Sequence, residues 1–185
     1  MALSSALVPL GTPAPDFVLP DLEGRPVHLS DLRDQPVLVV AFLCNHCPYV
    51  QHVEQQLGEV ARQVEEAGGA LVGICSNDVI GYPDDDVPGL VAQVARAGWS
   101  FPYLVDSDQD IARAFGAACT PDFFVYGPDR ALRYRGAFDA ATPGNDEPVD
   151  GSLLLAAVSH VLAGEEVPEP HRPSLGCGIK WRSKP

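Results

Sequence analysis

Two cysteines stand three residues apart in the segment Cys44-Asn45-His46-Cys47-Pro48. A Cys-x-x-Cys pair at the beginning of a helix brings two sulfurs within bonding distance across one turn, where unpaired N–H groups and the helix dipole stabilise a thiolate. Such a pair exchanges disulfides: Cys44 attacks a partner disulfide, and Cys47 then displaces the partner thiol and closes the Cys44–Cys47 bond. We predict that Cys44 is the more exposed, attacking sulfur and that the reaction needs no bound cofactor.

His46 is the most informative neighbour of the pair. We expect its imidazole to lie near Cys44, to favour the thiolate and to make the redox couple relatively oxidising. A histidine that faces solvent is the alternative. Half of a zinc site is the alternative for the cysteine pair, but zinc prefers four ligands and the sequence contains no second Cys-x-x-Cys and no His-x-His. We therefore predict no metal.

The hydrophobic pattern around the pair predicts one α/β domain with a central mixed sheet, helices on both faces and an N-terminal β-hairpin. The continuous apolar run 37–43 has the character of a buried parallel strand. The expected hairpin strands are 16–20 and 25–29, the other strands 70–76, 103–105, 122–126 and 132–138, and the helices 50–64, 90–98, 153–162 and one that Ser107 and Asp110 cap. We expect the domain over residues 1–164 and a Pro-rich tail over 165–185, packed on or near it.

Composition narrows the partners and the compartment. The 185 residues carry a formal net charge of −13, which disfavours nucleic acid and anionic membrane surfaces. No apolar run approaches the roughly 20 residues that cross a bilayer, and the first residues lack the basic start of an export signal. Five cysteines are an odd number, which argues against a purely structural disulfide framework. We expect a soluble cytoplasmic protein with reactive or buried thiols.

Residues 42–50, Thr120-Pro121 through Tyr126, and 134–136 resemble the thioredoxin-like superfamily over nearly the whole chain. The chain is more closely similar to the peroxiredoxin-like branch of redoxin proteins, often labelled alkyl hydroperoxide reductase or thiol-specific antioxidant. That branch carries Cys-Asn-His-Cys-Pro-Tyr and a C-terminal Gly-Cys-x-Ile-Lys-Trp, here residues 176–181. The resemblance implies a thioredoxin-like fold and a cis Thr120–Pro121 bond that faces the cysteine pair, with the preceding backbone available to an extended substrate. An ordinary trans proline is the alternative.

The chain departs from this resemblance in ways that leave three functions open. Thioredoxins proper have Trp before the first cysteine and Gly-Pro between the pair, where this chain has Leu43 and Asn45-His46. Peroxiredoxins would make Cys47 peroxidatic, but Cys44 replaces their Thr or Ser and the Thr120-Pro121 region replaces their arginine, which implies weak peroxidase activity. Our first choice is a thiol–disulfide oxidoreductase for protein or low-molecular-weight thiols and disulfides. A peroxide-consuming thiol peroxidase and a redox-inactive binding module are the alternatives.

The remaining cysteines and one acidic turn complete the candidate residues. We expect Cys75 to be a core residue, and Cys119 either to pack in the core or to lie near the redox pair. Cys177, between two glycines in a mobile tail, is a candidate third thiol if the tail folds back. The stretch 81–86 lacks the ligand spacing of a calcium loop, so we predict a solvated acidic turn that caps a helix.

Overall fold

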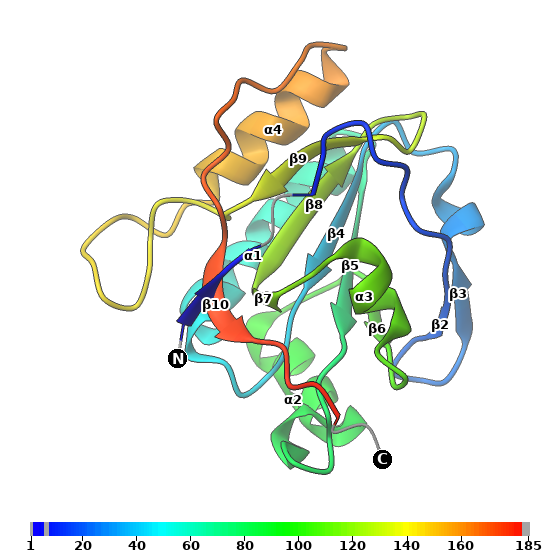
Figure 1. Ribbon diagram of the computed structural model, residues 1–185, viewed down its shortest axis with the longest axis vertical. Helices are drawn as coiled ribbons and strands as arrows, with labels where there is room; N and C mark the ends of the chain where they lie inside the picture. The colour runs from blue at the N-terminus through cyan, green and yellow to red at the C-terminus, as the bar shows by residue number, and fades with distance from the viewer. Residues whose placement is uncertain (1, 6–7, 183–185) are drawn as a thin grey trace.

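The structure is a computed structural model that describes residues 2–5 and 8–182 (Figure 1). A five-stranded mixed sheet with the order β6-β5-β4-β8-β9 forms its centre. β4, β5 and β6 are parallel, whereas β8 pairs antiparallel with both β4 and β9. The strands are β4 (Leu38–Phe42), β5 (Ala70–Cys75), β6 (Tyr103–Val105), β8 (Asp122–Tyr126) and β9 (Leu132–Gly136). The predicted mixed sheet and thioredoxin-like architecture are confirmed.

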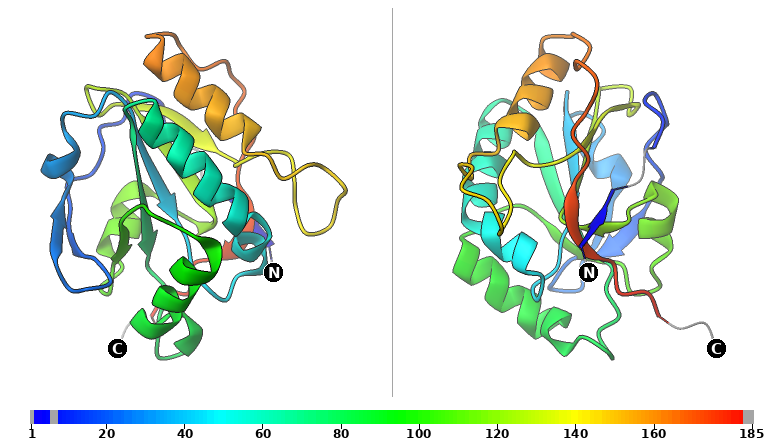
Figure 2. Two further views of the ribbon diagram at one scale, coloured as in Figure 1. Left: turned by 180° about the vertical axis from the view of Figure 1, so that it is seen from behind. Right: turned by 60° about the vertical axis from the view of Figure 1, so that its left-hand side comes forward.

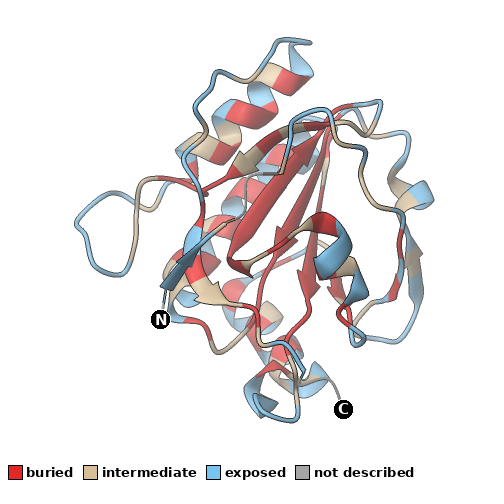
Figure 3. Cartoon of the chain, viewed as in Figure 1, coloured by how far each residue is buried: buried red, intermediate tan, exposed pale blue. Residues whose placement is uncertain are grey.

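β4 is the central strand, and all five of its residues are buried (Figure 3). Its side chains alternate between two cores, because successive residues of a strand point to opposite faces. Val39 and Ala41 face one core, and Leu38, Val40 and Phe42 face the other. The uninterrupted apolar run in the sequence therefore reflects a strand that is covered on both sides.

Helices cover both faces of the sheet (Figure 2). One core contains residues of α1 (Pro48–Glu66), α2 (Val87–Ala97) and α4 (Ser152–Leu162). The other core contains residues of α3 (Asp110–Phe115) and of the hairpin formed by β2 (Val18–Pro20) and β3 (Pro26–His28). Two short 3-10 helices, η1 (Leu29–Leu32) and η2 (Pro83–Asp85), complete the connections.

A second sheet joins the two ends of the chain. β10 (Leu175–Gly178) lies between β1 (Ala2–Ser4) and β7 (Cys119–Thr120), antiparallel to both, and Figure 2 shows β1 and β10 side by side. The segment expected to be a mobile tail around Cys177 therefore contains a paired strand. That strand lies beside the residues that precede Pro121.

Some boundaries differ from the predictions for local reasons. α3 begins at Asp110 and not at Ser107, because the side chain of Asp106 accepts the N–H groups of Ile111 and Ala112. β9 ends at Gly136, two residues before the predicted end. Within the described residues, no helix has the length and apolar character needed to cross a membrane.

Candidate active site

The cysteine pair lies where β4 leads into α1. Cys47 is the N-cap of α1 and Pro48 is its first residue. Proline fits there because the first N–H groups of a helix have no partner within the helix. Cys47, rather than Cys44, therefore occupies the position in which the free N–H groups and the dipole act most directly.

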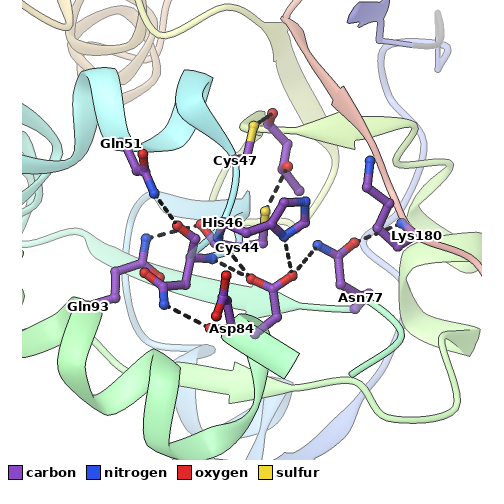
Figure 4. A network of polar contacts seen from close by, with 12 residues as sticks. Cys44, His46, Cys47, Gln51, Asn77, Asp84, Gln93 and Lys180 are labelled. Atoms are coloured by element: carbon purple, nitrogen blue, oxygen red, sulfur yellow. Dashed lines mark hydrogen bonds and ion pairs between the residues drawn. The ribbon is translucent and has the colours of Figure 1, made fainter. Parts of the chain in front are cut away.

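Both sulfurs contact one residue from a distant part of the chain. The Sγ of Cys44 lies 3.1 Å from the Oγ1 of Thr120, and the Sγ of Cys47 lies 3.2 Å from the carbonyl oxygen of Thr120 (Figure 4). The Thr120–Pro121 bond is cis, as the resemblance implied. The predicted site residues Cys44, Cys47, Thr120 and Pro121 are thus brought together.

The exposure of the two cysteines differs from our prediction. Cys44 and Cys47 are both fully buried, each with 0% of its surface exposed. The prediction that Cys44 is the more exposed of the two sulfurs is therefore wrong. Its basis was position in the sequence alone, which does not show the segments that cover the end of α1.

The two thiols have opposite electrostatic environments. The pKa of Cys47 is lowered to about 4, chiefly by a hydrogen bond from the Cys44 thiol, with further help from Cys177 and from the N–H of Val50. Burial raises the pKa of Cys44 well above its usual value, and the nearby Asp85 charge acts in the same direction. Cys47 is thus the more acidic thiol of the pair.

The contacts of Thr120 depend on the protonation state of the pair. Its carbonyl accepts a hydrogen bond from Cys47 only while that thiol keeps its proton. When Cys47 is ionised, the Thr120 hydroxyl can donate to Cys44 Sγ while the Cys44 thiol donates to Cys47. An ordered chain of donors then ends on the thiolate.

The loop between the cysteines is held by the buried carboxylate of Asp85 in η2. Its Oδ1 accepts the N–H groups of Asn45 at 2.7 Å and His46 at 3.1 Å. Its Oδ2 lies 2.6 Å from Nδ1 of His46 and accepts the side-chain amide of Asn77 at 2.8 Å. Asp85 is buried, which contradicts the prediction that the whole 81–86 turn is solvated, although Asp86 caps α2 as expected.

His46 is turned toward Asp85 and stacks on the ring of Tyr82, with 4.9 Å between the ring centroids. His46 lies near Cys44, as expected, but its Nδ1 is bonded to Asp85 and not to the thiol. The ligand atoms of Cys44, His46 and Asp85 lie within 4.8 Å of one another and are the one group in the described ranges that could hold a metal ion. The His46 and Asp85 atoms are already bonded to each other.

Further polar residues hold the same loop, and no sequence pattern points to them. Gln93 of α2 donates to the carbonyl of Cys44 at 3.1 Å, and Gln51 of α1 donates to the carbonyl of Asn45 at 2.8 Å (Figure 4). The amide of Asn45 bonds the carbonyl of Asp84 and accepts from Arg96. Glutamine and arginine on helices usually face solvent, so a contact pattern of this kind is visible only in three dimensions.

β10 occupies the backbone edge at Thr120. Cys177 stands opposite Thr120 in the strand register, and Gly178 stands opposite Cys119. The expectation that this edge is open to an extended substrate is therefore wrong for the described arrangement. Cys177 packs on the core that contains the cysteine pair and helps to lower the pKa of Cys47.

The other two cysteines lie in the core. Cys75 is buried in β5, and burial raises its pKa to about 12, as expected of a packing residue. Cys119 is buried in β7 next to Thr120, and burial raises its pKa as well. All five cysteines are free thiols. A cavity of about 880 Å³ between β9, α4 and the following loop has none of the five in its lining.

The chain is similar to several known proteins. A protein-family model described as "AhpC/TSA family" matches residues 10–135. The chain is 28% identical over 118 residues to "Thiol-disulfide oxidoreductase ResA" of Geobacillus thermodenitrificans, which covers 64% of this chain and 63% of the relative. The chain thus spans less than two thirds of that relative.

Two further proteins are similar. A Mycobacterium tuberculosis protein named "Putative peroxiredoxin Rv2521" is 30% identical over 118 residues, covering 63% of this chain and 69% of the relative. The crystal structure of a hypothetical protein from Sinorhizobium meliloti superposes with a TM-score of 0.96 and 45% identity, covering 98% of this chain and 99% of that one. The fold therefore has a counterpart of nearly equal extent.

Proposed function

We propose that this chain, which belongs to the AhpC/TSA family, catalyses thiol–disulfide exchange through Cys44 and Cys47. The observation that carries the proposal is the hydrogen-bonded pair of thiols at the N-terminus of α1, of which Cys47 is the acidic member. A thiolate is the nucleophile in disulfide exchange, and a neighbouring thiol closes the protein disulfide.

The order of the two cysteines is the reverse of that expected from sequence. Cys47 attacks one sulfur of a partner disulfide, which forms a mixed disulfide and releases the first partner thiolate. Cys44 then attacks the Cys47 sulfur, closes the Cys44–Cys47 bond and releases the second partner thiolate. The proton of Cys44 passes to one released thiolate and the other takes a proton from water, so the partner leaves as two thiols and the protein carries the disulfide.

The partners that we propose are protein or low-molecular-weight thiols and disulfides. The relative named as a thiol–disulfide oxidoreductase supports this class. The formal net charge of −13 favours partners without strong negative charge. Because both sulfurs are fully buried, a partner reaches them only after a covering segment has moved or through another thiol.

Insulin reduction with dithiothreitol as the electron source tests this function. We expect turnover by the full chain, complete loss in Cys47→Ser, and loss of at least tenfold in Cys44→Ser. Cys75→Ala is the matched control, because Cys75 is a buried cysteine that belongs to a packing position, and it should retain activity. If Cys47→Ser keeps full activity, the proposal is wrong.

A thiol peroxidase is the second candidate, because the acidic Cys47 and the "Putative peroxiredoxin" relative both favour it. Cys47 would attack a peroxide to give a sulfenic acid and an alcohol or water, and Cys44 would then close the disulfide with loss of water. The hydrogen bonds of the two sulfurs in the described residues include no arginine. We expect hydrogen peroxide consumption to be slow beside disulfide exchange, and a faster peroxide reaction reverses this ranking.

The redox-inactive binding module predicts a pair that stays reduced in oxidising glutathione buffers, which mass spectrometry detects directly.

We also propose that the protein works in the cytoplasm. The odd number of cysteines and the five free thiols support a reducing compartment. Cell fractionation with an antibody to the chain tests the location, and recovery outside the cytoplasm contradicts it.

A further inference from the structure

The strand edge beside the cysteine pair holds a segment of the protein's own chain. Extended peptides bind many proteins by adding a strand to an exposed sheet edge, with backbone bonds for affinity and side chains for specificity. At Cys119 and Thr120 this place is taken by β10, which pairs there antiparallel. β10 thus lies as a bound peptide would, and its own cysteine stands opposite Thr120.

The sequence of β10 suits this close position. A Cβ atom added at Gly176 would overlap the carbonyl group of Thr120, so only glycine lets the strand lie against the cis peptide. The ends of the segment are anchored as well. The hydroxyl of Ser174 donates to the carbonyl of Gly136, and the N–H of Lys180 donates to Asn77, which also bonds Asp85.

The three thiols form a series from the surface to the core. Cys177 is half-buried, whereas Cys47 and Cys44 are fully buried. Cys177 stands opposite Thr120 and packs on the core that contains Cys47 and Cys44, and Thr120 contacts the sulfurs of both. Cys47 therefore has a neighbouring thiol on each side, and of the three only Cys177 retains an exposed surface.

We propose that Cys177 is a third redox thiol, which forms a disulfide with Cys47 and carries exchange between solvent-borne thiols and the buried Cys44–Cys47 pair. This inference rests on the proposed function and adds a residue and a route to it. β10 holds the thiol in place as an internal substrate.

The steps balance without any further reagent. Starting from a Cys44–Cys47 disulfide, Cys177 attacks the Cys47 sulfur, the Cys44 sulfur leaves, and the proton of Cys177 passes to Cys44. An external thiolate then attacks the outer sulfur, that of Cys177, and Cys47 leaves as a thiolate. A second external thiol attacks the mixed disulfide, so two external thiols become one disulfide and the protein disulfide becomes two thiols.

The acidities of the thiols favour the second step, in which the external thiolate attacks Cys177. A disulfide opens fastest when the departing sulfur has a low pKa. The pKa of Cys47 is lowered to about 4, whereas burial and the neighbouring Cys47 raise the pKa of Cys177 to about 11. Attack on the half-buried Cys177 sulfur, with departure of Cys47, is therefore favoured both by access and by the leaving group.

Disulfide mapping of the full-length Cys44→Ser variant tests the bond itself. After oxidation with diamide, quenching in acid and digestion under acidic conditions, we expect a cross-linked peptide pair that contains Cys47 and Cys177. The double variant Cys44→Ser/Cys177→Ser should lack it. If Cys47 in Cys44→Ser is found only as a free thiol or in an intermolecular disulfide, with Cys177 unmodified, the inference is overturned.

The rate of reduction tests the role of the bond. Wild type and Cys177→Ser are oxidised to the Cys44–Cys47 disulfide, mixed with glutathione, quenched at intervals and alkylated. We expect reduction at least tenfold slower in Cys177→Ser, and an unchanged rate in Cys75→Ala. Equal rates in wild type and Cys177→Ser contradict the relay while leaving the Cys44–Cys47 function intact. If wild type forms no Cys44–Cys47 disulfide at all, the proposed function fails, and the mapping of Cys44→Ser still decides whether Cys177 bonds Cys47.

Discussion

Gly176 lies directly against the carbonyl of Thr120, so that β10 covers the same residue whose carbonyl and hydroxyl contact the two active-site sulfurs. One backbone position thus couples the C-terminal strand to the thiol pair. Because neighbouring residues of a strand point to opposite faces, the side chain of Cys177, the next residue, lies on the other face of β10 from the contact at Gly176.

We expect Gly176→Ala to displace β10 from Thr120. The added methyl group would overlap the Thr120 carbonyl, and backbone must shift to relieve it. The Cys47–Cys177 cross-link in the Cys44→Ser background should fall severalfold, and Cys47 should become more accessible to iodoacetamide. Gly144→Ala is the matched control, since nothing lies within 4 Å of a Cβ there. An undiminished cross-link in Gly176→Ala contradicts the role of this contact.

Absorbance at 240 nm reports the ionisation of Cys47. Because its pKa is lowered to about 4, we expect wild type to show a thiolate signal that is lost on acidification around that pH and is absent in Cys47→Ser. Thr120→Val removes the hydroxyl that supports Cys44 and should move the midpoint upward. The folded pKa is below the ordinary value of 9.0, so thiolate formation stabilises the fold fully above about pH 9 and ceases to do so as the pH falls through 4. A midpoint near 9 in wild type refutes the assignment.

Asp85→Asn tests the support of the loop between the cysteines. The carboxylate accepts from Asn45, His46 and Asn77, and an amide would direct its own NH2 group at one of these donors. We expect a loss of about 3 kcal/mol in the free energy of unfolding, measured with urea, because donors to a buried charged group are left unpaired. Asp84→Asn is the control, since Asp84 bonds Asn45 through its backbone carbonyl. Equal stabilities of the two variants contradict the role of Asp85.

The sequence predicted the parts of the site that depend on local pattern. The apolar run predicted β4, and the spacing of Val50, Val53 and Leu57 predicted α1. A strand buried on both faces and an amphipathic helix each have a characteristic hydrophobic pattern. The order of the cysteines could not be predicted this way. Their burial and acidity depend on Thr120 and on Cys177, which lie 73 or more residues away along the chain.

Asp85 and β10 escaped prediction for a related reason. Three consecutive aspartates are normally solvated, and only the free N–H groups of a loop some 40 residues earlier make it favourable to bury one of them. β10 has the sequence Leu-Gly-Cys-Gly, and two glycines in four residues weaken any strand pattern. Its strand is defined by the partners on either side and by the contact at Gly176.

The pH dependence of stability should depend on Asp122, which follows the cis proline and is completely buried. Burial raises its pKa to about 7, and its Oδ1 has no partner in the described part of the chain. The folded pKa lies above the unfolded value of 3.8, so protonation of Asp122 stabilises the fold fully below pH 3.8. This contribution is lost as the pH rises through the folded pKa of about 7. Three pKa units correspond to at most about 4 kcal/mol. We expect Asp122→Asn to lose less stability than wild type between pH 5 and pH 8 in urea unfolding, and parallel losses in the two proteins would show that Asp122 does not titrate in this range.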